Sequence, residues 1–178
     1  MLKISLLVIV VLLAILAGVI EMQPPEYQVT RSATIQAPAN VVFEQINDFH
    51  KWEAWSPWGK LDPAMKTTYT GPAAGTGASY AWVGNSDVGE GRMTILESRP
   101  AEFVRIRLEF IEPFASVANT EFSVKPEGNG VAVTCLMREE KKFLSKAMCM
   151  VQSMDTMIGP DFERGLKQLK SAAEGAAK

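Results

Sequence analysis

Within residues 103–111 of the chain, apolar and charged residues alternate strictly from 104 to 110. The apolar positions are Val104, Ile106, Leu108 and Phe110. Because successive side chains of a β-strand point to opposite faces, this pattern predicts a strand with one dry and one wet face, as in antiparallel sheets. Similar patterns predict further strands at residues 27–35, 77–83, 92–98, 120–124 and 131–137, and a short strand is expected at 66–70.

Two helices are expected beside these strands. Pro38 is well placed to begin a short helix of about nine residues, whose apolar face is Val42, Phe43 and Ile46. Residues 142–173 then switch to helical spacing, and Pro160 is expected to kink this helix because its nitrogen carries no hydrogen. This order of elements predicts an α+β fold in which a curved antiparallel sheet wraps around a long C-terminal helix.

An uncharged and almost wholly aliphatic run occupies residues 4–20, ahead of the predicted domain. As a helix it would be roughly 25 Å long, at the short end of what spans a bilayer. The alternative is a cleaved signal peptide, but the run is longer than the usual apolar core of such peptides and no small-residue cleavage site follows it. We therefore divide the chain into a transmembrane anchor with a short Pro-containing linker, 1–26, and a ligand-binding domain, 27–178.

The charges beside the run predict its orientation. Lys3 lies before it, whereas Glu21 and Glu26 follow it. The positive-inside rule then favours a cytoplasmic amino terminus. The protein is expected in a membrane, single-pass, with its domain outside the cytoplasm, in the periplasm if the source is bacterial.

Composition argues against two classes of partner. The net charge is −2 and the charges are interspersed without a basic stripe, so no nucleic-acid partner is expected. His50 is the single histidine, and Cys135 and Cys149 lack the paired spacing of a metal or redox motif. We therefore expect no metal site, no cofactor and no disulfide, and the sequence leaves protein partners open.

A series of short motifs spans the predicted domain. They are the segments 55–58 (WSPW), 62–63 (DP), 77–80 (GASY), 82–85 (WVGN), 88–91 (VGEG), 93–98 (MTILES), 154–159 (MDTMIG) and 161–163 (DFE). Together they resemble the START-like (SRPBCC) family, often described as polyketide cyclase/dehydrase-like. The resemblance implies a helix-grip fold with a deep cavity between sheet and terminal helix, used by various members for lipids, polyketides, plant hormones or quinones. Cys135 stands where that family commonly has Trp, which implies either a larger cavity or a gap here. Pro160 stands where a helix former is common, which implies a bend in the terminal helix.

The residues on the inward faces of the predicted strands and terminal helix are expected to bind the ligand. These are Tyr80, Trp82, Met93, Ile95, Phe110, Phe122, Met137, Met150 and Met154. Tyr80 is the best polar group to orient a ligand, because its hydroxyl bonds while its ring packs, although a hydrogen-bonded core tyrosine fits the pattern equally well. Trp52, Trp55 and Trp58 form either an aromatic entrance or a hydrophobic plug under a loop.

The sequence shows no converging catalytic group, so no catalytic residue is assigned. Glu97 shares the alternation face of Met93 and Ile95, where a buried carboxyl would gain a raised pKa and the capacity of a general base. A solvated carboxylate at a strand end is the alternative and the more common case. Asp155 and Asp161 are expected to cap or solvate the terminal helix, and His50 to lie on the surface.

Three functions follow from these patterns. The first is a membrane-anchored domain that binds a small hydrophobic ligand, such as a lipid, an isoprenoid or an aromatic, polyketide-like molecule, in an apolar cavity. The second is a cyclase- or hydratase-like enzyme that uses Tyr80 or Glu97 as acid or base. The third is a structural or interaction domain with a filled core, which cavity volume distinguishes from the other two.

Overall fold

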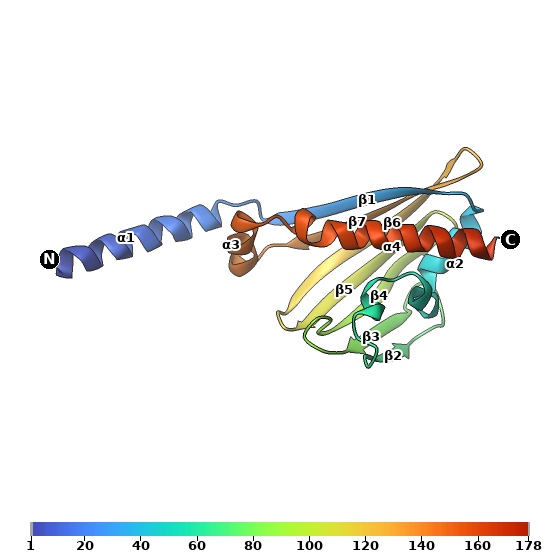
Figure 1. Cartoon of the computed structure of the whole chain (residues 1–178), viewed down its shortest axis with the longest axis horizontal. Helices are drawn as coiled ribbons and strands as arrows, with labels where there is room; N and C mark the ends of the chain where they lie inside the picture. Colours follow the sequence, from blue (N-terminus) through green and yellow to red (C-terminus); the bar gives the residue numbers. More distant parts are fainter. Residues whose placement is uncertain (1, 178) are drawn as a thin grey trace.

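The computed structural model describes residues 2–177 and contains one seven-stranded antiparallel sheet in the order β1-β7-β6-β5-β4-β3-β2. Figure 1 shows this curved sheet with the long helix α4 across one face and the helix α1 projecting from one end. The strands are β1 (Glu26–Ile35), β2 (Lys66–Thr70), β3 (Ser79–Val83), β4 (Glu90–Arg99), β5 (Phe103–Glu112), β6 (Ser116–Glu127) and β7 (Gly130–Glu140). The helices are α1 (Leu2–Glu21), α2 (Ala39–Asn47), the 3₁₀ helices η1 (Phe49–Ala54) and η2 (Trp58–Lys60), α3 (Phe143–Val151) and α4 (Met154–Ala176).

This architecture confirms the predicted α+β class and the order of its elements. The alternation over β5 is confirmed residue by residue, since Val104 and Ile106 are buried, whereas Arg105 forms an ion pair with Glu121 on the opposite face. On the inner side, α4 packs chiefly against β1 and buries one face of its length. Its core-facing residues include Phe162, Leu166, Leu169 and Ala173.

The terminal helical segment differs from the predicted single kinked helix. The chain forms two helices that separate at Gln152 and Ser153, both of which have extended backbone angles. The Ser153 hydroxyl accepts a hydrogen bond from the backbone N–H of Thr156 at 3.2 Å and so caps a new helix. The break therefore precedes Pro160, which lies inside α4.

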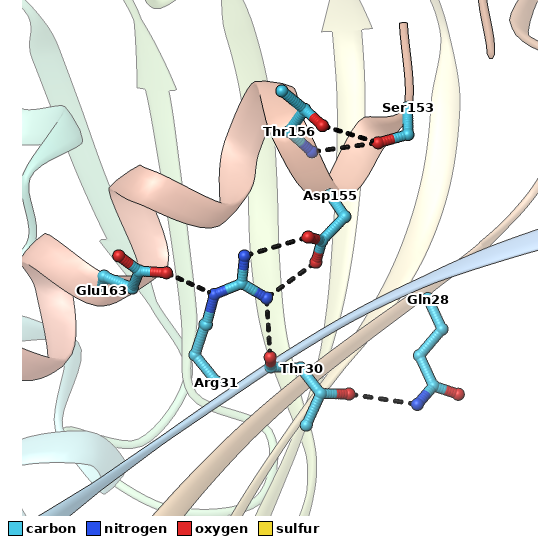
Figure 2. A network of polar contacts seen from close by, with 7 residues as sticks. All are labelled: Gln28, Thr30, Arg31, Ser153, Asp155, Thr156 and Glu163. Atoms are coloured by element: carbon cyan, nitrogen blue, oxygen red, sulfur yellow. Dashed lines mark hydrogen bonds and ion pairs between the residues drawn. The ribbon is translucent and has the colours of Figure 1, made fainter. Parts of the chain in front are cut away.

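One cation holds the start of α4 against β1 (Figure 2). The Arg31 guanidinium donates two hydrogen bonds to Asp155, at 2.7 and 3.1 Å, and one to Glu163 at 2.7 Å. These bonds lower the pKa of Asp155 and raise that of Arg31. Gly159 provides the space, because a Cβ there would stand 2.1 Å from the Arg31 Nη2 atom. Asp155 is thus an ion-pair partner that fixes α4, which is more specific than the predicted capping or solvation.

The amino-terminal helix has the length and composition of a membrane-crossing segment. An 18-residue window within Lys3–Glu21 has a mean hydropathy of 2.9, and 6% of that window is buried against the rest of the chain. A signal sequence has the same properties, so this helix by itself leaves both alternatives open.

Candidate ligand-binding cavity

A cavity of about 590 Å³ lies between strands β2 to β7, the helix α4 and the segment that holds η1 and η2. This volume falls within the roughly 300–1,000 Å³ that is usual for small-molecule sites. Apolar side chains from the strands form its inner wall, and Ile158, Phe162 and Leu166 of α4 close the opposite side. The structure therefore contains the space that a filled core would lack.

Six of the nine predicted ligand-binding residues line this cavity. They are Tyr80, Trp82, Met93, Phe110, Phe122 and Met137. All six come from strands whose inward face was predicted from alternation, and the register Tyr80↔Met93 sets two of them side by side. The period-two pattern therefore located the sheet side of the site.

Three predicted positions lie outside the cavity lining. Ile95 is 1% exposed and belongs to the close-packed core beside Ile106. Met154 packs partly buried against the core at the first residue of α4, one turn before Ile158, which does line the cavity. Met150 is 42% exposed on α3. Its assignment to the sheet-facing stripe was wrong because the break at residues 152–153 separates α3 from α4.

All four tryptophans of the chain line the cavity. Trp52 and Trp55 are buried, and their ring N–H groups donate to the backbone carbonyls of Ile46 and Gln45 at 2.9 and 3.0 Å. Trp58 is 37% exposed and packs edge-on against Phe162 of α4. Trp52 and Trp55 are thus fixed wall residues that are anchored to α2, and Trp58 lies where the cavity approaches solvent.

Tyr80 provides a polar group within this aromatic wall. Its ring packs between Trp82 and Tyr69, with centroid separations of 5.9 and 5.3 Å. Burial, with a smaller contribution from Tyr69, raises the Tyr80 pKa to about 12, so its hydroxyl stays protonated near neutral pH. Such a group donates or accepts a hydrogen bond but is a poor base.

Glu97 does not face the cavity, which agrees with the solvated carboxylate that the sequence favoured and not with the alternative of a buried general base. The β4–β5 register shifts between Ile95 and Glu97, so that Ile95 pairs with Ile106 while Glu97 pairs with Arg105. This bulge inserts Leu96 as an extra residue and turns Glu97 to the outer face. There it forms ion pairs with Arg99 and Arg105.

The carboxylates that do line the cavity form no acid–base pair. Asp62 is buried, but its two oxygens accept the backbone N–H groups of Ala64 and Asn85 at 2.9 and 2.8 Å. It therefore fastens the segment after η2 to the β3–β4 turn, which is a structural role. Glu53 and Asp87, which also contribute to the lining, are exposed side chains.

Cys135 lies in the cavity wall on β7, at the position where the family resemblance led us to expect extra space. Burial raises the pKa of its thiol, so the reactive thiolate is suppressed.

His50 is exposed, as predicted, and it stacks on Tyr69 and shares a 3.0 Å hydrogen bond with Asp48. Among residues 2–177 no group of three His, Cys, Asp or Glu side chains is arranged to hold a metal ion.

Sequence reasoning missed several lining residues. Thr67 and Tyr69 lie on the short strand β2, whose register places Tyr69 opposite Tyr80. Tyr69 shares its face with Thr67, and both oppose inward residues of β3. The sequence Lys-Thr-Thr-Tyr-Thr has no apolar alternation that would have shown this face. Ile158, Phe162 and Leu166 follow i, i+4 spacing within the predicted terminal helix, but none of them was predicted to bind a ligand.

A comparison with models of known protein families identifies the family of this chain. A model described as "Polyketide cyclase / dehydrase and lipid transport" matches residues 26–174. The chain belongs to this family. The match covers all seven strands and most of α4, so the domain has the helix-grip fold that the sequence motifs suggested. Membership supports a domain that binds a hydrophobic ligand.

Solved structures share this fold at low sequence identity. Protein CV1439 from Chromobacterium violaceum has a TM-score of 0.55 and 17% identity, with 85% of this chain and 99% of that chain covered. TTHA0849 from Thermus thermophilus has a TM-score of 0.58 and 18% identity, with 85% and 100% covered. The di-domain ARO/CYC protein StfQ from the steffimycin biosynthetic pathway gives 0.61 and 10%, with 85% of this chain and 52% of that longer protein covered. These likenesses establish the fold alone, and a comparison with curated proteins found no match.

Proposed function

We propose that this protein binds a small hydrophobic molecule in its cavity while α1 anchors it in a membrane, with the domain on the extracytoplasmic side. The cavity is the observation that carries the proposal. Its volume is about 590 Å³, its wall is mainly aromatic and aliphatic, and Tyr80 supplies a protonated hydroxyl within it. A site of this kind suits a lipid, an isoprenoid or an aromatic, polyketide-like ligand.

The membrane part of the proposal depends on α1. Its aliphatic side chains are exposed along nearly its whole length, for example Leu6, Leu12 and Ile15 at 62, 59 and 58%. Exposure of so many large apolar groups to water is costly, whereas a bilayer solvates them and the helix satisfies its own backbone. A tether at this point would keep the cavity close to molecules dissolved in the membrane.

The enzymatic alternative has less support. An acid–base mechanism needs groups that converge within hydrogen-bond reach of a substrate. Glu97 is on the outer face and Asp62 is occupied by backbone donors, so neither is a base for Tyr80, whose raised pKa makes it a weak acid. We therefore assign binding, without a catalytic residue, to this cavity.

The tryptophans make the binding proposal directly testable. The full chain, incorporated into lipid vesicles, is titrated with 1-anilinonaphthalene-8-sulfonate, a dye that accepts energy from excited tryptophan. Because all four tryptophans line the cavity, a bound dye should lower their emission in a saturable way, with about one dye per chain, and excess oleate should reverse the effect. Emission that falls without saturation, or that oleate leaves unchanged, would contradict a cavity site.

Anchoring has a separate test. Membranes that contain the full chain are washed at alkaline pH and floated on a density gradient, and the amino terminus of the mature protein is sequenced. Retention in the membrane with residues 4–20 present supports the anchor. A soluble protein that begins near Glu21 refutes it in favour of a signal peptide.

A further inference from the structure

The helix α3 presents its apolar side to solvent and its polar side to the protein. Its exposed large side chains are Phe143, Leu144, Met148, Met150 and Val151, at 49, 55, 45, 42 and 91% exposure. At about 100° per residue these positions, with Ala147 between them, fall within a single arc of about 160°. Ser145, Lys146 and Cys149 occupy the remaining arc. A helix that packs on a water-soluble domain has the opposite arrangement.

Hydrogen bonds hold this helix where α1 ends. The Lys146 ammonium donates to the Glu21 carboxylate at 2.7 Å and to the Glu21 backbone carbonyl at 3.2 Å, and its side chain is only 13% exposed. The Lys141 backbone N–H donates to the carbonyl of Pro25 in the linker at 2.7 Å. In Figure 1, α3 correspondingly lies between the end of α1 and the start of α4. Glu21 directly follows the last apolar residue of α1, so α3 is held at the level where that helix would leave a bilayer.

The turn between β5 and β6 adds a further apolar side chain at the same end of the domain. The Lys142 ammonium donates to the Ala115 carbonyl in this turn at 2.8 Å, which ties the turn to the start of α3. Phe114, the neighbour of Ala115, is 66% exposed. We define the end patch as Phe114, Phe143, Leu144, Met148, Met150 and Val151.

We propose that the end patch is a membrane-docking surface, which inserts at the level of the lipid headgroups and fixes the domain against the bilayer that α1 enters. This inference rests on the proposed anchoring. The amphipathicity of α3 supports the docking surface independently of the anchor. Its apolar arc faces away from the domain, and such an arc is suited to the boundary between headgroups and acyl chains. A long apolar helix that enters the bilayer one residue away from its contact with α3 makes lipid the occupant that this geometry favours.

The test measures the lipid environment of α3 in the full chain. In a Cys149→Ser background, Val151→Cys provides a fluorophore site on a side chain that is 91% exposed, so labelling should leave the fold intact. Asn129→Cys provides the matched control in the β6–β7 turn, at the far end of the 12-residue strand β6, which is about 40 Å long at about 3.3 Å per residue. Cys135 should stay unlabelled because it is buried and burial raises its pKa.

The labelled chains are incorporated into phosphatidylcholine–phosphatidylglycerol vesicles that carry a spin-labelled lipid as quencher. We expect a blue-shifted and strongly quenched label at residue 151 and an unquenched label at residue 129. Adding Leu144→Asp and Met148→Asp should remove most of the quenching at residue 151 while the protein still floats with the vesicles.

The remaining outcomes separate this inference from the anchoring itself. A chain that floats with the vesicles but whose label at residue 151 is quenched no more than that at residue 129 overturns the docking surface and leaves anchoring intact. Shielding of residue 151 in native membranes but not in pure lipid overturns the lipid assignment in favour of a protein partner. A chain that does not float overturns both proposals.

Discussion

Substitutions at two nearby positions on β4 can distinguish a cavity from an ordinary close-packed core. Met93 and Ile95 project to the same inner face, two residues apart, but Met93 lines the cavity while Ile95 is 1% exposed among close-packed side chains. The same substitution, to Trp, therefore adds volume to empty space at one position and to filled space at the other. The two positions share a strand and a face, and both side chains are apolar, so the comparison isolates the space around the side chain.

The expected magnitudes are well separated. Ile95→Trp should destabilise by about 1–3 kcal/mol through overpacking, which lowers Tm by roughly 2–12 °C for a domain of this size. Met93→Trp should cost less than about 1 kcal/mol, because the indole enters the cavity of about 590 Å³. It should nevertheless remove dye binding, whereas Ile95→Trp should retain it at temperatures where the protein is folded.

Thermal unfolding of the full chain gives the stability of each variant. Native mass spectrometry counts bound 1-anilinonaphthalene-8-sulfonate as a mass adduct, which avoids interference from the added tryptophan. Equal destabilisation at Met93 and Ile95, or unchanged dye binding by Met93→Trp, would refute the reasoning, because both results would place Met93 in ordinary core.

Three further predictions concern single interactions. Tyr80→Phe should weaken dye binding by roughly 2- to 12-fold if the hydroxyl bonds the ligand, since a neutral hydrogen bond contributes about 0.5–1.5 kcal/mol; unchanged affinity in a titration would place the hydroxyl outside the contact. Arg31→Gln should lower Tm at neutral pH. Because Arg31 lowers the pKa of Asp155 in the folded state, the ion pair stabilises the protein above the ordinary carboxyl pKa. This stabilisation is lost as the pH falls through the lowered pKa of Asp155. The Tm difference from the wild type should therefore shrink as pH falls below the ordinary Asp pKa of about 4, and a difference independent of pH would contradict the ion-pair account. Ser153→Ala should destabilise by about 1 kcal/mol through loss of the cap, whereas Ser153→Asp should retain most of the stability in denaturant unfolding; equal losses in both variants would argue against capping.

Strand alternation predicted the sheet and its dry face because the period of two depends only on backbone geometry. Tyr80, Trp82 and Phe110 were placed correctly on this basis. The same rule failed at Glu97, because one inserted residue at a bulge reverses the facing of every position after it. The local sequence Ile-Leu-Glu-Ser interrupts the alternation, because two apolar residues are followed by two polar ones, and this interruption was the available sequence signal of the bulge.

The helical side of the site was harder to predict. Apolar spacing continued from α3 into α4, and that continuity concealed the break at Gln152 and Ser153. Ser153 followed by Asp155 is a common start of a helix, since a hydroxyl caps the first turn and an acidic group favours its positive end. That local signal indicated the break, but it competes with a longer apolar pattern that fits one continuous helix. Met150 was misplaced as a result.

The central claim is tested most directly by identifying what the cavity holds when the protein is isolated from its cell. The full chain is purified from its own membranes in mild detergent, and its intact mass is measured by native mass spectrometry beside that of Met93→Trp. The account predicts a small-molecule adduct on the wild-type chain, soluble in organic solvent after denaturation, and no adduct on Met93→Trp. A wild-type chain without any adduct that also binds no hydrophobic dye, or an adduct that persists in the filled variant, would contradict a ligand-binding role for this cavity.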